Sequence, residues 1–256
     1  MGEDRQGRGA QGGRLSVQLP YRIEEEPDGA EHLLVTWPGL HPGGAPPSAT
    51  VERLKRFRAH RLAIGADEHT YVGPRGTLQG AHASVAILRA EARRLGIPRE
   101  NIVAYGPSMR AVTALWMGFR AQVGRIIVGG APLYLGRRLR ELDRVMGPSP
   151  EAVAYRERFL ALAARDDGTP GDVVLDGLIP EALEGVTEQM TVRLLISHDD
   201  EMFRDSVALY QRLDEHPVID GDLVIREYGN HGGLKDAFKA YLTEALIAAG
   251  VPRHAQ

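Results

Sequence analysis

Ser108 stands where an apolar segment passes directly into a segment expected to be helical. Residues 101–105 are mostly apolar, Gly106 and Pro107 follow, and a helix should begin immediately after the serine. A buried strand that enters a helix through so short a turn projects the serine hydroxyl from the edge of a sheet. The sequence therefore predicts that Ser108 is a nucleophile, with a helix N-cap as the simpler alternative.

Later segments supply an imidazole and an acid. A serine hydroxyl reacts poorly until a nearby imidazole removes its proton. His231 follows the apolar run at residues 223–228 and precedes two glycines, and Asp200 follows the run at residues 192–197. Serine, acid and histidine in this chain order, each just after a strand, are typical of a catalytic triad on a parallel sheet. We therefore expect His231 to be the base and Asp200 the acid that orients it.

The identity of the acid is less narrowly defined than that of the base. Asp199, Asp200 and Glu201 are consecutive, and neighbouring side chains of an extended segment point to opposite sides. The spacing from Ser197, a small residue at the strand end, favours Asp200. Asp199 stays open as the alternative, and Glu201 ranks third.

Two backbone N–H groups are expected to bind the oxyanion that forms during acyl transfer. The first belongs to Met109, because the residue after the nucleophile begins a helix whose N-terminus favours negative charge. The second belongs to Leu40 or to its neighbour Gly39, in the glycine-rich segment after the apolar run at residues 33–37.

Arg110 lies two residues after the nucleophile, in the first turn of the expected helix. An unpaired guanidinium is costly to bury. It must therefore pair with an acid, bind a substrate carboxylate or phosphate, or extend into solvent. The sequence slightly favours a structural ion pair, and substrate binding by Arg110 is the alternative.

The elements that must position these residues alternate along the chain. Residues 15–23 and 32–37 flank the turn signal Glu-Pro-Asp-Gly and predict an antiparallel N-terminal hairpin. Apolar runs separated by helical stretches predict a mostly parallel sheet covered by helices. The runs lie at residues 33–37, 61–66, 101–105, 125–129, 192–197 and 223–228, and the helices at residues 51–60, 78–95 and 234–249.

Residues 133–186 interrupt this alternation. They predict two helices, at residues 137–146 and 151–164, and then a loop at residues 166–171. We interpret them as a lid inserted between two strands, with an ordinary crossover and a long loop as the alternative. The first of these helices has a basic side, which either is solvated or receives an acyl-carrier-linked or anionic substrate; it is formed by Arg137, Arg138, Arg140 and Arg144.

Composition narrows the functional classes. The 256 residues are 43% hydrophobic and carry a net charge of −3, which is ordinary for a globular protein and argues against nucleic acid as a partner. Cysteine is absent, so thiol catalysis and thiolate metal sites are excluded. Residues 1–14 predict a disordered tail without a secretory signal, and no apolar run approaches the ~18 residues of a membrane span.

The expected protein is therefore a cytoplasmic enzyme with a small-molecule or acyl-carrier-linked substrate. The phosphate-loop, dinucleotide and zinc-helix motifs are absent at the places where they would be expected, so we expect neither a cofactor nor a metal. The oligomeric state is not predicted, and a homo-oligomer is one alternative.

Over residues 15–250 these features resemble the α/β-hydrolase fold, a three-layer sandwich that here would carry the N-terminal hairpin and the helical lid. A closer resemblance is to the bacterial accessory-secretion and capsule-biosynthesis branch of these serine enzymes. In that branch a strand ends in Gly-x-Ser-x-Gly-Gly and a later strand continues into Gly-Ala-Pro. The matching segments begin at Tyr105 and Val128, with Pro38-Gly39-Leu40 after the early strand. Arg110 departs from the pattern, because it replaces a glycine.

The resemblance implies a serine hydrolase or acyltransferase that forms an acyl-enzyme from an ester, thioester or related acyl substrate, in glycan or secondary-metabolite biosynthesis. Two alternatives keep the fold without this chemistry. One is a non-catalytic assembly or binding protein, and the other is a lyase or cyclase that uses the triad as a proton relay.

Overall fold

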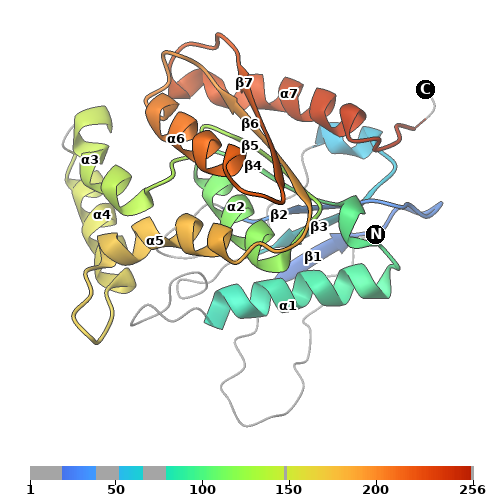
Figure 1. The fold of residues 1–256 in the computed structure, drawn as a ribbon, viewed down its shortest axis with the longest axis horizontal. Helices are drawn as coiled ribbons and strands as arrows, with labels where there is room; N and C mark the ends of the chain where they lie inside the picture. Colours follow the sequence, from blue (N-terminus) through green and yellow to red (C-terminus); the bar gives the residue numbers. More distant parts are fainter. Residues whose placement is uncertain (1–18, 39–51, 66–78, 147–148, 255–256) are drawn as a thin grey trace.

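A computed structural model describes residues 19–38, 52–65, 79–146 and 149–254. Its centre is a seven-stranded sheet in the order β1-β3-β2-β4-β5-β6-β7 (Figure 1). Every neighbouring pair is parallel except β1 with β3, which confirms the mostly parallel sheet. The strands are β1 (Tyr21–Glu24), β2 (Leu33–Thr36), β3 (His60–Ile64), β4 (Ile102–Pro107), β5 (Arg125–Gly129), β6 (Met190–Ile196) and β7 (Ile219–Ile225).

The predicted N-terminal hairpin is wrong in its pairing, although β1 is antiparallel as expected. β1 pairs with β3, with Tyr21 opposite Ile64, whereas β2 pairs in parallel with β3 and β4. The turn signal forms a turn, in which Gly29 N–H donates to the Glu26 carbonyl. All four residues of β2 are buried, which suits a central strand with a neighbour on each side. The part-exposed β1 takes the edge.

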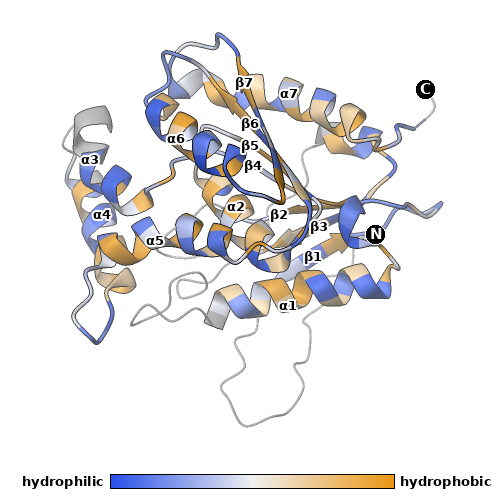
Figure 2. Ribbon diagram, viewed as in Figure 1, coloured by the Kyte–Doolittle hydropathy of each residue, from blue (hydrophilic) through white to orange (hydrophobic). Residues whose placement is uncertain are grey.

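Helices cover both faces of the sheet, as predicted for a three-layer sandwich (Figure 1). Side chains alternate between two buried clusters: Leu33 and Val35 enter one, and Leu34 enters the other. Figure 2 shows apolar residues concentrated in the strands and mixed with polar ones along the outer helices. The first cluster is covered by α1 (Gln79–Arg94), α2 (Met109–Ala121), α5 (Gly171–Glu184) and α6 (Phe203–Asp214), and the second by η1 (Glu52–Arg56) and α7 (Leu234–Ala248).

The segment between β5 and β6 contains three helices, not two. α3 (Leu135–Met146) and α4 (Pro150–Ala163) were predicted, but α5 was not. Its Gly171, Gly177 and Pro180 are poor helix formers, and packing overrides this preference because α5 buries an apolar face against α2 and α3. In the described part of the chain, no helix is long and apolar enough to cross a membrane.

Candidate active site

Ser108 occupies the turn between β4 and α2 in a strained backbone conformation. Its φ is 55° and its ψ is −128°, a region that costs a residue with a side chain about 1–3 kcal/mol. Neighbouring backbone groups hold it there: Ser108 N–H donates to the Gly129 carbonyl at 2.7 Å, and Ala111 N–H donates to the Ser108 carbonyl at 2.8 Å. The serine side chain thereby stands at the carboxyl end of the sheet.

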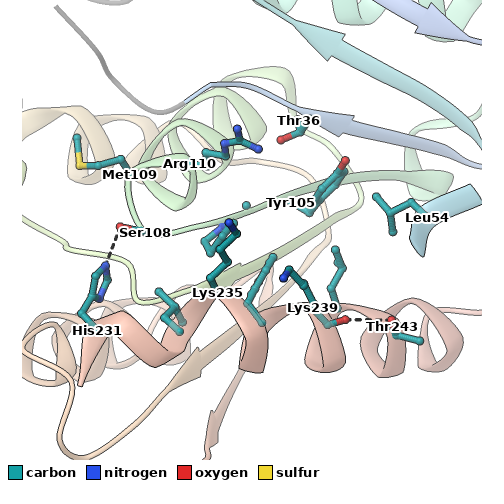
Figure 3. Close-up of a pocket in the computed structure, with 15 residues that line it drawn as sticks. Thr36, Leu54, Tyr105, Ser108, Met109, Arg110, His231, Lys235, Lys239 and Thr243 are labelled. Atoms are coloured by element: carbon teal, nitrogen blue, oxygen red, sulfur yellow. Dashed lines mark hydrogen bonds between the residues drawn. The ribbon is translucent and has the colours of Figure 1, made fainter. Parts of the chain in front are cut away.

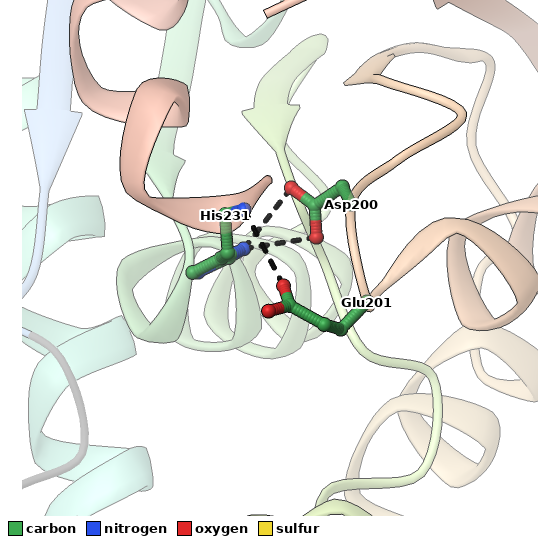
Figure 4. A group of neighbouring side chains, drawn as sticks. All are labelled: Asp200, Glu201 and His231. Carbon is green, nitrogen blue, oxygen red and sulfur yellow. Dashed lines mark hydrogen bonds and ion pairs between the residues drawn. The ribbon is translucent and has the colours of Figure 1, made fainter. Parts of the chain in front are cut away.

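Ser108, His231 and Asp200 form one continuous hydrogen-bonded chain. Ser108 Oγ lies 2.7 Å from His231 Nε2 (Figure 3). His231 Nδ1 lies 3.0 Å and 3.1 Å from the two carboxylate oxygens of Asp200 (Figure 4). The three residues follow β4, β7 and β6 at the same sheet edge, where parallel α/β sheets bind their ligands. An imidazole held in this way can take the hydroxyl proton at Nε2 while the carboxylate binds Nδ1–H.

The Asp200 carboxylate is fully buried but well supplied with hydrogen-bond donors. Its side chain is 0% exposed, and it accepts hydrogen bonds from the Tyr228 hydroxyl at 2.6 Å and from Met202 N–H at 2.8 Å. Burial acts to raise the pKa of Asp200, but the hydrogen bonds from His231, Tyr228 and Met202 outweigh it, so the pKa falls below its ordinary value. Asp200 is therefore ionised at neutral pH and can stabilise an imidazolium.

The two neighbouring acids lie differently. Asp199 is exposed and makes no hydrogen bond to His231 in the structure. Glu201 Oε2 accepts a hydrogen bond from the His231 backbone N–H at 3.3 Å (Figure 4). Of the three candidate acids, the structure brings Asp200 to the imidazole ring, and Glu201 holds the backbone that carries it.

Two supporting residues were missed by the sequence analysis. Tyr228 closes an apolar run, and nothing in its local sequence indicates that its hydroxyl reaches Asp200. Asn230 accepts a hydrogen bond from Gly232 N–H at 3.0 Å and caps η4 (His231–Gly233). Asparagine is a preferred N-cap residue, and Asn230 lies four residues before the helix predicted at residues 234–249, so a short capped turn could have been expected here.

A cavity of about 510 Å³ begins at Ser108 and runs along α7 (Figure 3). Met109 lines it and begins α2, and first-turn N–H groups have no acceptor within their own helix. The other predicted oxyanion donors, Gly39 and Leu40, lie outside the described residues. The described lining comes from β2, β4, α2, η1 and the region around α7, with none from residues 133–186. The lid therefore stays a prediction.

Arg110 lines the same cavity and is half-buried. The structural ion pair that the sequence favoured for Arg110 is not formed with any acid in the described part of the chain. The ion pair therefore stays a prediction, beside substrate binding as the alternative. The position of Arg110 in the first turn of α2 is as predicted.

The basic side of α3 is largely neutralised by neighbouring acids. Arg137 pairs with Asp205, and Arg140 pairs with Asp172 and Asp176 of α5. These contacts join α3 to α5 and α6. Because these arginines are engaged in ion pairs between helices, the described residues give no support to a carrier-protein surface on α3.

One group of described residues has the composition of a metal site. Ligand atoms of Asp200, Glu201 and His231 lie within 4.8 Å of one another (Figure 4). Both ring nitrogens of His231 already face partners, Ser108 on one side and Asp200 on the other. A metal on either nitrogen would displace one of them, so this geometry suits proton transfer better than metal binding.

Comparisons with known proteins find likeness in structure. No family model and no curated protein matches the sequence. The capsule O-acetyltransferase of Neisseria meningitidis serogroup A has a TM-score of 0.63 at 14% identity, covering 92% of this chain and 96% of its own. The acylaminoacyl peptidase of Pyrococcus horikoshii has a TM-score of 0.66 at 14% identity, covering 100% of this chain and 43% of its own. The acetyl xylan esterase 1 of Thermoanaerobacterium sp. has a TM-score of 0.60 at 10% identity, covering 91% and 79%.

These structures are α/β-hydrolase-type proteins, and they share the present fold over nine-tenths or more of this chain. The sheet order, the helices on both faces and the strained serine turn after β4 agree with that likeness. The chain described here is an α/β-hydrolase-fold protein.

Proposed function

We propose that this chain is a serine hydrolase or acyltransferase in which Ser108 is the nucleophile, His231 the base and Asp200 the orienting acid. The observation that carries the proposal is the continuous contact from Ser108 Oγ through the imidazole to a buried carboxylate, at 2.7 Å and 3.0 Å. The cavity that opens at Ser108 offers room for an acyl substrate.

In the first half of the reaction, Ser108 Oγ attacks the carbonyl carbon of an ester or thioester, and its proton passes to His231 Nε2. Asp200 stabilises the imidazolium through Nδ1–H. The oxyanion accepts hydrogen bonds from Met109 N–H and from the N–H of Gly39 or Leu40. When the tetrahedral intermediate collapses, the leaving alcohol or thiol takes the proton from Nε2, and the acyl group stays on Ser108.

In the second half, His231 Nε2 takes a proton from water or from an acceptor hydroxyl, which attacks the acyl-enzyme. Ser108 regains its proton as the product leaves. Water gives hydrolysis and a hydroxyl gives transfer. The names of the similar structures include both reactions. Hydrolysis is represented by an acetyl xylan esterase, and transfer by capsule O-acetyltransferases, one of which is in complex with CoA. They support an O-acyl reaction on a carbohydrate-related substrate.

A non-catalytic assembly protein is the second candidate. It is favoured by the likeness to the Gap123 glycosylation-associated complex of Streptococcus agalactiae, with a TM-score of 0.64 at 16% identity over 95% of this chain and 45% of its own. A scaffold has no need of a strained serine in contact with an imidazole. That contact therefore favours the enzyme.

Labelling with a fluorophosphonate separates the two candidates. We expect one covalent adduct, mapped to Ser108 by peptide mass spectrometry. Ser108→Ala should abolish it and lower the turnover of 4-nitrophenyl acetate by about 10⁴–10⁶-fold, since the change removes a triad nucleophile. His231→Ala should prevent labelling, whereas the matched control His198→Ala, at an exposed histidine, should not. An adduct that persists in Ser108→Ala, or its absence from folded wild-type protein, would contradict the proposal.

A further inference from the structure

The wall of the cavity formed by α7 and the turn before it carries two stripes of different chemistry. The members of each stripe are four residues apart, so they lie on one face of the helix in successive turns. The polar stripe consists of His231, Lys235, Lys239 and Thr243, and the apolar stripe of Leu234, Phe238 and Leu242. A ligand that lies along α7 from Ser108 therefore meets polar groups on one side and apolar groups on the other.

Besides the two lysines of the polar stripe, a third cation lines the cavity: Arg110, which projects into it from the first turn of α2 (Figure 3). Lys239 Nζ pairs at 2.5 Å with Asp236, whose side chain is 87% exposed. Arg110 and Lys235 have no acidic partner among the described residues. No described acid lines the cavity, so the part of its wall formed by Arg110 and Lys235 carries positive charge that no described acid neutralises.

The surroundings of Arg110 strengthen its attraction for an anion. Its guanidinium lies close enough to the buried Tyr105 to affect that residue: burial raises the pKa of the Tyr105 hydroxyl, and the charge on Arg110 acts in the opposite direction. A charge in such a partly buried place interacts more strongly than one in open water. The planar fork of a guanidinium also matches the oxygens of a carboxylate or a phosphate.

The geometry points to an anionic amphiphile as the substrate: an acyl compound whose carboxylate or phosphate binds between Arg110 and Lys235. Its hydrocarbon portion lies against the apolar stripe of α7. Arg110 is two residues from Ser108, and Lys235 is one turn beyond His231, so the anionic group sits near the reacting carbonyl. This inference rests on the serine chemistry proposed above and specifies which acyl compounds that chemistry uses.

Three ligands with the same hexyl chain test the charge requirement by isothermal titration calorimetry on the whole chain: hexan-1-ol, heptanoate and hexyl phosphate. We expect at least one anion to bind about tenfold or more tightly than the alcohol, since a charge-assisted hydrogen bond contributes roughly that factor. The more tightly bound anion identifies the head group. Equal affinities for all three ligands would overturn the inference.

Variants locate the effect. Arg110→Gln and, independently, Lys235→Gln should each weaken the binding of the preferred anion about tenfold and leave the binding of hexan-1-ol unchanged. Lys235 is exposed, so its replacement should not disturb folding. The matched control is Arg93→Gln, which removes the same charge from an exposed site on α1, across the sheet from α7. A loss as large in the control would mean that net charge, not the cavity, attracts the anion, and would refute the site.

Fluorophosphonate labelling, run beside the calorimetry, separates this inference from the proposed mechanism. The preferred anion should slow the labelling of Ser108, and hexan-1-ol at the same concentration should not. Labelling that neither anion slows would overturn the anionic substrate and leave the serine mechanism intact. Anion binding that depends on Arg110, in a protein whose Ser108 is never labelled, would support the binding site and contradict the mechanism.

Discussion

The Cβ of Arg110 fills the space in front of the Cα of Gly106. A Cβ added to Gly106 would lie 2.6 Å from the Arg110 Cβ and 2.7 Å from the Arg110 carbonyl oxygen, well inside the separation at which non-bonded atoms attract. The first turn of α2 can cross β4 so closely because residue 106 has no side chain. The Cβ of Arg110 therefore fits at this position because the strand residue that it faces is glycine.

Gly106→Ala should therefore force α2 away from β4 and misplace Ser108. Overpacking of this kind costs about 1–3 kcal/mol of unfolding free energy, measurable by urea denaturation, and fluorophosphonate labelling should slow as well. Because the new Cβ also meets the backbone of residue 110, Gly106→Ala/Arg110→Gly should recover only part of the loss. Full recovery in the double variant would show that the side chain alone causes the conflict.

Asp200→Asn should slow turnover roughly 10⁴-fold, because an amide in place of the carboxylate favours the wrong imidazole tautomer. Asp199→Asn should have little effect on turnover, since Asp199 is exposed. Steady-state kinetics on the two purified variants make the comparison. The opposite ranking would transfer the role of the acid to Asp199.

The serine turn and the place of Asp200 beside His231 were predictable because their signals are local. A strand that runs through Gly106-Pro107 into a helix leaves Ser108 few alternatives, and the spacing from Ser197, the small residue at the strand end, favoured Asp200 over Asp199. The pairing of β1 was not predictable in this way. Both edges of β2 are occupied, by β3 and β4, so β1 pairs with the free edge of β3, and neither of these neighbours is adjacent to β1 in the sequence.

Tyr228 is the supporting residue that sequence patterns could not reveal, and it has a sharp test. Burial and the hydrogen bond to Asp200 raise the pKa of the Tyr228 hydroxyl, so it stays protonated and donates to the carboxylate. Tyr228→Phe should lower kcat about tenfold with KM little changed, because one charge-assisted hydrogen bond that positions Asp200 is lost. Fluorophosphonate labelling should slow by a similar factor.

Tyr241→Phe is the matched control for this change. Tyr241 is buried whereas Tyr228 is half-buried, and among the described residues the Tyr241 hydroxyl has no hydrogen-bond partner. Its removal should leave kcat and the labelling rate unchanged. Equal losses in Tyr228→Phe and Tyr241→Phe would indicate a general packing effect, and the positioning role of Tyr228 would then be wrong.

His60 should make the stability of the fold depend on pH. It is buried in β3, and its Nδ1 accepts a hydrogen bond from Glu26 N–H at 3.1 Å, which requires a ring that is unprotonated at this nitrogen. Burial lowers the pKa of His60 below the ordinary value of 6.5. The unfolded chain therefore binds the proton first as the pH falls, and the free energy of unfolding should decrease once the pH drops below about 6.5.

Urea denaturation at a series of pH values between 7.5 and 5 tests this expectation. The quantity to compare is the slope of the unfolding free energy against pH. His60→Asn keeps an acceptor for Glu26 N–H but cannot be protonated, so its unfolding free energy should fall less steeply with acidification than that of the wild type. His82→Asn replaces an exposed histidine and should leave the slope close to that of the wild type. The buried His32, whose pKa is also lowered, mainly by burial, should account for part of the slope that persists in His60→Asn. Parallel curves for the wild type and His60→Asn would show that the protonation of His60 is not coupled to folding.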